Sequence, residues 1–393
     1  MKEPSEIQLQ IAVFALVSAS FANIYITQPV LPVLRQEFHA DTIVVSLSVS
    51  AVILGMALSN LPLGALADRL PIRPIILSGG ACVALAGLLC AATENIWLLI
   101  AARFVQGIFI PTMTTCLAAY LAKTLPTSRL SIIMGSYVAA TVLGGLCGRL
   151  LGGWIHPPLH WRYAFVSASA LILIAIFAAL RILPRQTAGI GEAIDSPGYG
   201  ELLRRRDLWP FYFCAAGSFA VFSSIFNYLP FRVTAEPFSL STEITTVLYL
   251  VYIVGIFMGP TAGKISNYFG SGITLIAGSL LLGASLAVIA MPSLPAIVVG
   301  LIGTCAGFFT IHATAVGSLN RRISGGQGRA NALYVLFYYL GGWAGITLSG
   351  FAYAHGGWTS VISTCFAMLV VPLYAGIKDF QATRNARHIS RIS

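Results

Sequence analysis

Twelve apolar segments, each long enough to cross a lipid bilayer as a helix, constrain this chain more than any other feature. A membrane span needs about 20 mostly apolar residues, because the hydrocarbon core offers the backbone no water. The predicted spans are residues 9–32, 43–66, 73–92, 96–121, 131–154, 162–183, 208–230, 244–265, 272–291, 295–317, 329–353 and 358–377. We therefore predict an all-α integral membrane protein with twelve transmembrane helices.

The longest polar interruption separates the first six spans from the last six. It predicts an N-terminal six-helix bundle over 1–183, a cytoplasmic linker over 184–207, a C-terminal six-helix bundle over 208–378 and a basic cytoplasmic tail over 379–393. Charged residues make up only 9% of the chain, against about 25% in an ordinary soluble domain. This composition argues against a soluble enzyme and against a disordered protein.

The basic residues are distributed unequally between the two sets of loops. If the N-terminus lies inside, 18 of the 23 Lys and Arg residues fall on that side, and only Arg35, Arg162 and Arg232 fall on the other. Cytoplasmic loops collect Lys and Arg, so both termini are predicted to be cytoplasmic in a multi-pass protein of the inner (plasma) membrane. The net charge of +10 is then a topology signal, and no nucleic-acid partner is expected.

The two halves of the sequence share a spacing pattern. The motif Tyr137-x6-Gly144-Gly145-x2-Gly148 recurs 197 residues later as Tyr334-x6-Gly341-Gly342-x2-Gly345. Two halves of six spans in the same orientation form the parallel repeat of one large class of transporters. The repeat predicts two pseudo-symmetric six-helix bundles.

The loop between spans 2 and 3 contains Gly64, Asp68, Arg69 and Arg73. It resembles the signature loop of the major facilitator superfamily, Gly-x-x-x-Asp-Arg-x-Gly-Arg-Arg, but departs from it at residues 71 and 72. The resemblance implies a conformational gate, in which Asp68 pairs with a cation or a helix N-terminus of a neighbouring helix. The alternative is a solvated loop charge that only sets topology.

Span 4 contains Arg103-x2-Gln106-Gly107, which is similar to the Arg-x-x-Gln-Gly motif of the same family. An arginine inside a span is costly unless it faces a cavity or a partner. Arg103 and Gln106 share one helix face, so both are candidate substrate-binding residues. The alternative is an arginine whose head reaches the outer interface.

Span 5 resembles the family's exporter motif, with every glycine present and Arg149 in place of proline. Glycines four residues apart let another helix approach closely and rock. Gly144, Gly148 and Gly152 are therefore predicted to belong to the gate, and the resemblance implies export. Arg149 is either a substrate-binding cation or an arginine that reaches the interface.

Polar residues in span 1, before Pro29 and Pro32, resemble the drug and sugar efflux branch, within it the arabinose-efflux-like or YnfM-like permeases. The glycine motif with Arg149 and the run 228–232 support the same branch. The predicted substrate-binding residues are Asn23, Tyr25, Gln28, Arg103, Gln106, Arg149, Asn227, Tyr228, Tyr334 and Tyr338.

None of the 13 acidic residues lies in the middle of a span. His312, in span 10, is the deep residue that titrates near neutrality, so His312 and Asp68 are the proton-coupling candidates. Glu37 and Asp41 are alternatives at the outer end of span 1, and His312 has an alternative role as a polar packing residue.

No phosphate-binding loop, zinc-protease helix or nucleophile elbow occurs in the sequence, which argues against an enzyme. The predicted function is secondary active export of a small organic molecule (a drug, sugar or metabolite) by alternating access, in exchange for protons. Uptake or exchange of an organic anion is the first alternative, and a non-transporting membrane receptor or scaffold is the second. We expect a monomer in the lipid bilayer with no cofactor and no metal site.

Overall fold

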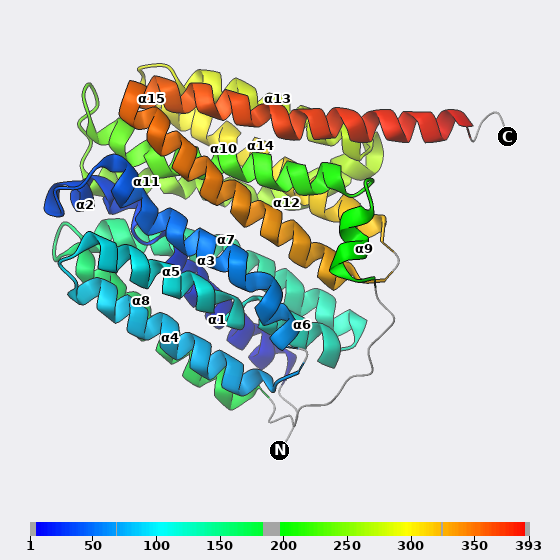
Figure 1. The fold of residues 1–393 in the computed structure, drawn as a ribbon, viewed down its shortest axis with the longest axis horizontal. Coiled ribbons are helices and arrows are strands. Elements are labelled where there is room, and N and C mark those ends of the chain that lie inside the picture. The colour runs from blue at the N-terminus through cyan, green and yellow to red at the C-terminus, as the bar shows by residue number, and fades with distance from the viewer. Residues whose placement is uncertain (1–4, 68, 184–196, 324, 390–393) are drawn as a thin grey trace. The chain divides into compact units, whose positions relative to one another are not determined.

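The computed structural model describes residues 5–67, 69–183, 197–323 and 325–389. Every regular element in these ranges is a helix (Figure 1). Eleven of these helices are long and apolar enough to cross a membrane, and the last of them contains two spans. The predicted all-α membrane fold is therefore confirmed.

The chain divides into two compact units, described separately below. Unit 1 contains residues 1–194 and 233–250, and unit 2 contains residues 195–232 and 251–393. Residues 184–196 of the predicted linker lie outside the described residues. The remainder, 197–207, holds the short helix α9 (Tyr199–Arg204).

Unit 1 consists of helices in which the predicted spans 1 and 4 are interrupted. Its elements are α1 (Glu6–Tyr25), η1 (Gln28–Val30), α2 (Leu31–Glu37), α3 (Thr42–Leu66), α4 (Ile72–Ala92), α5 (Ile96–Met113), α6 (Thr115–Thr124), α7 (Thr127–Ile155), α8 (Trp161–Ile182) and α11 (Thr242–Val247). Helix α1 packs against α7 and α8, and α5 packs against α3 and α4. The 3-10 helix η2 (Leu248–Ile253) crosses the boundary between the units.

Unit 2 contains five long helical segments besides α9. These are α10 (Trp209–Thr234, whose last two residues belong to unit 1), α12 (Val254–Phe269), α13 (Ser271–Ile289), α14 (Leu294–Arg321) and α15 (Gln327–Ile389). Non-helical backbone at Gly356 and Gly357 divides α15 into two spans, and the chain reverses direction there (Figure 1). Helix α15 continues to Ile389, so residues 379–389 of the predicted tail are helical.

Glycines on α7 lie directly against the backbone of α1. A Cβ atom added to Gly144 would lie 2.5 Å from the carbonyl oxygen of Ser18, and one added to Gly148 would overlap the carbonyl oxygen of Ala22. A Cβ atom added to Gly152 would overlap the carbonyl oxygen of Ile26, the residue that follows α1. The glycine motif therefore produces backbone-to-backbone packing, as its spacing predicts.

The corresponding glycines of unit 2 make the corresponding contact between α15 and α10. A Cβ atom on Gly345 would lie 2.5 Å from the carbonyl oxygen of Ala220, and one on Gly341 would overlap that of Ala216. The internal repeat seen in the sequence is thus a repeat of helix packing within each unit.

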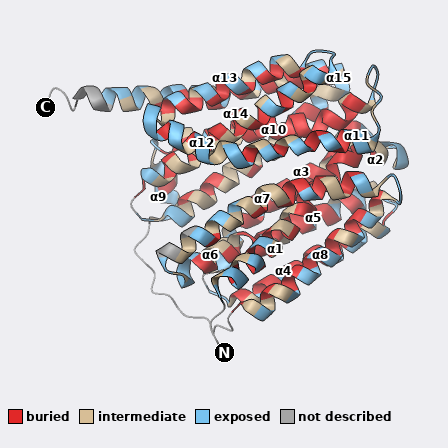
Figure 2. Cartoon of the chain, turned by 180° about the vertical axis from the view of Figure 1, so that it is seen from behind, coloured by how far each residue is buried: buried red, intermediate tan, exposed pale blue. Residues whose placement is uncertain are grey.

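Large apolar side chains are exposed along the outer faces of the helices. Phe177 is 59% exposed, Val370 is 61% exposed and Leu280 is 60% exposed. The long helices carry both buried and exposed faces (Figure 2). A surface this apolar is unfavourable in water and fits contact with lipid chains.

Candidate functional site

The first candidate site forms where span 1 is interrupted. Helix α1 ends at Tyr25, and the chain continues as a 3-10 turn that starts at Gln28. Pro29 has no backbone N–H, so it cannot donate to the carbonyl of Tyr25 as an uninterrupted helix would require. The last carbonyl groups of α1 therefore need other hydrogen-bond donors.

Arg103, on α5, supplies two of these donors. Its Nη1 donates to the carbonyl of Asn23 at 2.6 Å, and its Nη2 donates to the carbonyl of Ile24 at 2.5 Å. Its Nε donates to the carbonyl of Ser48 on α3 at 2.9 Å. A cation is stabilised at a helix C-terminus by the helix dipole, so Arg103 caps α1.

Gln106 completes this arrangement on the same face of α5. Its Oε1 accepts a hydrogen bond of 2.6 Å from Arg103, and its Nε2 donates to the carbonyl of Val83 on α4 at 3.1 Å. The same Nε2 lies 3.4 Å from the side-chain oxygen of Asn23. Arg103 is fully buried, and four hydrogen bonds engage its guanidinium. The geometry of Arg103 and Gln106 is that of a clamp joining four helices.

Arg149, on α7, lies on the other side of the interruption. Its Nε donates to Oε1 of Gln28 at 2.7 Å, and its Nη1 donates to the carbonyl of Gly145 at 2.7 Å. The guanidinium lies 3.9 Å from the centre of the Tyr25 ring and 5.5 Å from that of Tyr249. Arg149 is 2% exposed, so its charged group is buried in the protein.

The amide of Gln28 is only partly used. Its oxygen accepts from Arg149, while its Nε2 is buried and has no hydrogen-bond partner among the described residues. A buried N–H without a partner costs about 1–3 kcal/mol. This amide and the Arg149 guanidinium together offer hydrogen-bond donors beside two aromatic rings, an arrangement that can bind an anionic group.

The structure therefore brings together the six predicted substrate residues of the first half. Asn23, Tyr25 and Gln28 lie at the interruption of span 1. Arg103 and Gln106 contact Asn23, before the interruption. Arg149 contacts Tyr25 and Gln28, on either side of it.

The second candidate site lies in unit 2, between α14 and α15. The Tyr334 hydroxyl lies 2.9 Å from Nδ1 of His312. The ring of Tyr338 lies 5.3 Å from that of His312 and stacks on Phe219 at 3.7 Å. His312, Tyr334 and Tyr338, which were predicted separately, thus form one cluster in which a hydroxyl and an imidazole share a hydrogen bond.

Two other predicted residues of unit 2 have different surroundings. The Tyr228 hydroxyl donates to the carbonyl of Ile346 at 2.9 Å, and its ring stacks on Tyr353, so it joins α10 to α15. Both polar atoms of the Asn227 amide are buried without a hydrogen-bond partner among the described residues. Asn227 is thus a second buried amide with unused hydrogen-bonding capacity.

The predicted gate residues of the loop between spans 2 and 3 are only partly described. Asp68 lies outside the described residues. Arg69 is exposed, and Arg73 donates to the carbonyl of Leu183 at 3.4 Å. A Cβ atom on Gly64 would meet only a Thr115 methyl group at 3.7 Å, which is an ordinary contact, so close packing does not require glycine there.

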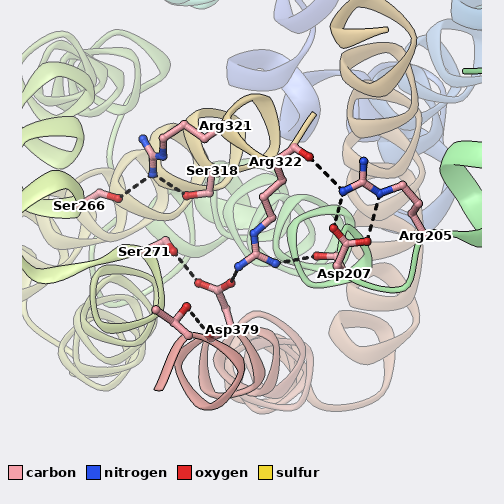
Figure 3. A network of polar contacts seen from close by, with 9 residues as sticks. Arg205, Asp207, Ser266, Ser271, Ser318, Arg321, Arg322 and Asp379 are labelled. Carbon is pink, nitrogen blue, oxygen red and sulfur yellow. Dashed lines mark hydrogen bonds and ion pairs between the residues drawn. The ribbon is translucent and has the colours of Figure 1, made fainter. Parts of the chain in front are cut away.

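A polar network at the end of α14 was not predicted from the sequence (Figure 3). Arg322 forms an ion pair with Asp379 of α15, and Ser271 of α13 donates to the same carboxylate at 2.6 Å. Asp379 is 1% exposed. Asp379 lies close to basic residues in the sequence and was therefore assigned to the predicted tail. The continuation of α15 beyond the apolar segment shows that it forms an ion pair with Arg322.

The same network includes the segment that precedes α10. Arg322 donates to the carbonyl of Asp207 at 3.0 Å, and Arg205 donates to the carbonyl of Arg322 at 3.0 Å (Figure 3). Arg205 also pairs with the Asp207 carboxylate at 2.6 Å. The hydrogen bond from Arg205 lowers the pKa of Asp207.

Neighbouring Arg321 contacts α12, in which Gly263 and Asn267 repeat the spacing of Gly64 and Asp68 with an asparagine in place of the aspartate. The Arg321 guanidinium lies 3.4 Å from the Asn267 side-chain oxygen. It also donates to Ser318 at 2.9 Å (Figure 3). Because Asn267 is neutral, this contact lacks the ion pair that an aspartate would provide.

Comparison with known proteins identifies relatives over nearly the whole chain. The inner membrane transport protein YnfM of Escherichia coli K12 is 27% identical over 382 residues, which cover 95% of this chain and 91% of that protein. The uncharacterized MFS-type transporter YybF of Bacillus subtilis is 26% identical over 374 residues, covering 93% and 92%.

Solved structures share the fold at lower identity. A bacterial homologue of the human lysosomal transporter Spinster, in an inward-facing and unoccupied conformation, has a TM-score of 0.76 at 16% identity and 98% coverage of both chains. The human organic anion transporter MFSD10 (TETRAN) has a TM-score of 0.69 at 19% identity, covering 95% of this chain and 100% of that one.

A family model provides the assignment. The model described as Major Facilitator Superfamily matches residues 13–325, a range that includes the glycine motif of α7, both buried arginines and His312. Together with the helical fold and its internal repeat, this match shows that the chain is a multi-pass membrane transporter that belongs to the Major Facilitator Superfamily.

Proposed function

We propose that this transporter exports a small organic anion across the inner membrane in exchange for protons. The observation that carries the proposal is the charge of the unit 1 interior. Among the described residues, the fully buried charged side chains are Arg103, Arg149 and Asp379. Both arginines belong to unit 1, whereas Asp379 belongs to unit 2 and pairs with Arg322.

Buried positive charge favours a substrate that brings negative charge. Removing a cation from water costs several kcal/mol unless hydrogen bonds or an opposite charge compensate. The carbonyl groups around Arg103 provide that compensation locally. Arg149 and the unused Nε2 of Gln28 can provide donors to a carboxylate or phosphate, while the rings of Tyr25 and Tyr249 pack on an apolar body.

His312 and Tyr334 are the proposed proton-coupling pair of unit 2. Their contact of 2.9 Å allows the imidazole to change protonation while keeping its hydrogen bond to the hydroxyl. Asp68 is the second candidate for this role. The glycines of α7 support export, because the exporter motif of the family has the same spacing.

Ligand-induced stabilisation of the purified protein tests the substrate class. Wild type, Arg149→Ala and the control Arg35→Ala, which removes an exposed arginine of unit 1, are heated with organic anions, sugars or cationic drugs. A ligand at 100 times its dissociation constant stabilises the folded state by about 2.7 kcal/mol. We expect organic anions to stabilise wild type and Arg35→Ala but not Arg149→Ala.

Two outcomes would contradict the substrate class. One is stabilisation by cations or neutral amphiphiles that Arg149→Ala leaves unchanged, which would favour a broad exporter. The other is equal stabilisation of wild type and Arg149→Ala by organic anions. Proteoliposomes test coupling separately: an imposed proton gradient should drive accumulation of the stabilising anion, and transport independent of that gradient would exclude proton exchange.

A further inference from the structure

A groove outside the candidate transport sites lies where the chain enters α10. It has a volume of about 480 Å³ and is lined by Leu203, Arg204, Arg206, Trp209 and Phe213. Two cations lie before the first residue of the span, and two aromatic residues lie within its first turns. The groove thus combines basic and apolar walls at the end of a membrane-crossing helix.

The basic wall consists of Arg204 and Arg206, which no described acidic side chain neutralises. In the run 204–206, Arg205 pairs with Asp207 and binds the carbonyl of Arg322. Arg204 and Arg206 are exposed, and neither forms an ion pair with a described residue. Arg204 and Arg206 lie on either side of Arg205 in the sequence. Their two guanidinium groups can bind a phosphodiester through charge-assisted hydrogen bonds.

The apolar wall is held in place by contacts within unit 2. Trp209 donates from Nε1 to the carbonyl of Leu203 at 2.9 Å, which fixes the corner between α9 and α10. Its ring lies 5.3 Å from that of Phe213 and 6.1 Å from that of Phe337. Phe213 is 40% exposed, so the groove opens toward the surface that contacts lipid chains.

We propose that this groove binds an anionic phospholipid of the leaflet beside the basic loops. Tryptophan is enriched at the height of lipid headgroups, and basic pockets beside membrane helices bind anionic headgroups. A soluble phosphodiester would use the arginines but leave the apolar wall exposed. A phospholipid matches both walls, with its phosphate at Arg204 and Arg206 and its acyl chains beyond Phe213.

Fluorescence quenching by brominated lipids tests this site in the full-length protein. The protein is reconstituted in phosphatidylcholine bilayers that contain brominated phosphatidylglycerol or brominated phosphatidylcholine. The signal of Trp209 is the difference between each protein and its Trp209→Phe variant. We expect brominated phosphatidylglycerol to quench Trp209 at much lower mole fractions than brominated phosphatidylcholine does.

The double variant Arg204→Gln/Arg206→Gln should reduce the preference for phosphatidylglycerol about 30-fold. This is the change in affinity expected when two arginines that interact with an anionic lipid surface are lost. The matched control Lys264→Gln/Arg384→Gln loses the same charge at exposed positions outside the groove and should keep the preference. In wild type, higher salt should weaken the preference, since it screens exposed charges; this measurement requires no variant to fold.

Three results would overturn the proposal. The first is equal quenching of Trp209 by the two brominated lipids. The second is a preference that survives the loss of both arginines or is lost equally in the control. The third is displacement of the lipid by soluble glycerophosphoglycerol at equal concentration, which would identify a site for free phosphodiesters.

Discussion

The two buried arginines differ in what their guanidinium groups contact. Arg103 binds backbone carbonyls of α1 and α3, and its position depends on a planar group that donates in three directions. Arg149 donates to the Gln28 side chain and to the carbonyl of Gly145, and it lies against aromatic rings. We therefore propose that Arg103 serves mainly to stabilise the interrupted span and that Arg149 serves mainly to recognise the ligand.

Lysine substitutions distinguish these roles, because an ammonium keeps the charge but loses the planar donor arrangement. Arg103→Lys should leave buried carbonyls without donors and lower stability by at least about 2 kcal/mol. Arg149→Lys should change stability less and weaken anion binding more. Thermal unfolding and ligand titration of both variants provide the comparison. The assignment is wrong if Arg103→Lys is as stable as wild type and only Arg149→Lys unfolds early.

The pair of His312 and Tyr334 makes a prediction about the pH dependence of transport. His312→Gln keeps a polar side chain but cannot take up a proton near neutrality, so the pH dependence of substrate flux should flatten. Tyr334→Phe should shift the pH profile without abolishing transport, because it removes only the hydroxyl beside the imidazole. A His312→Gln variant with the wild-type pH profile would remove this residue from the coupling mechanism.

At the scale of elements, the glycine contacts between α7 and α1 and between α15 and α10 are the most demanding packing. Gly148→Ala should destabilise unit 1 by about 1–3 kcal/mol, the usual cost of overpacking, because its Cβ would overlap a backbone carbonyl. Gly345→Ala should have a similar effect in unit 2. Gly135→Ala on α7 is the matched control: nothing lies within 4 Å of its Cβ, so it should be neutral or slightly stabilising.

Thermal unfolding of these three variants measures the difference in their stabilities. The transport rate of Gly148→Ala shows whether the contact between α7 and α1 also limits the movement of these helices during transport. Equal stability of Gly148→Ala and Gly135→Ala would mean that α1 and α7 are not held at the distance described.

The elements α9, α10 and α14 are joined by Arg205, Asp207 and Arg322. The pKa of Asp207 is lowered in the folded state. Its contribution to the free energy of unfolding is therefore fully present above the ordinary aspartate pKa, and it is lost as the pH falls through the folded-state pKa. The pair is partly exposed, so this contribution is at most about 1 kcal/mol. Asp207→Asn should remove that part of the acid-induced loss of stability. Stability curves of wild type and Asp207→Asn that stay parallel below pH 5 would contradict this.

At the scale of the whole molecule, the distribution of basic residues predicts that both termini face the cytoplasm. A green fluorescent protein fused after Ser393 should fluoresce, and alkaline phosphatase fused there should be inactive. Alkaline phosphatase inserted after His39, between spans 1 and 2, should be active. Activity at the C-terminal position would reverse the orientation on which the direction of export is based.

Much of the fold could be predicted because span length and glycine spacing are local properties of the sequence. Residue pairs were less predictable: the motif identified Arg103 as a cation inside a span, but only the ending of α1 explains which carbonyls it binds. The ion pair of Asp379 could not be predicted because a helix that continues beyond the apolar segment gives no apolar signal. Gly64 matches the glycine of the family's signature loop, yet the structure leaves room for a side chain there.

The glycine contacts also imply an asymmetry in how this protein tolerates sequence change. Gly144 and Gly148 meet the main chain of α1 at Ser18 and Ala22, and the Ser18 hydroxyl donates to the carbonyl of Ala140 on α7 at 3.4 Å. The contact therefore requires glycine on α7, whereas a small side chain is sufficient on α1. A collection of variants selected for transport should accept several small residues at 18 and 22 and almost nothing but glycine at 144 and 148.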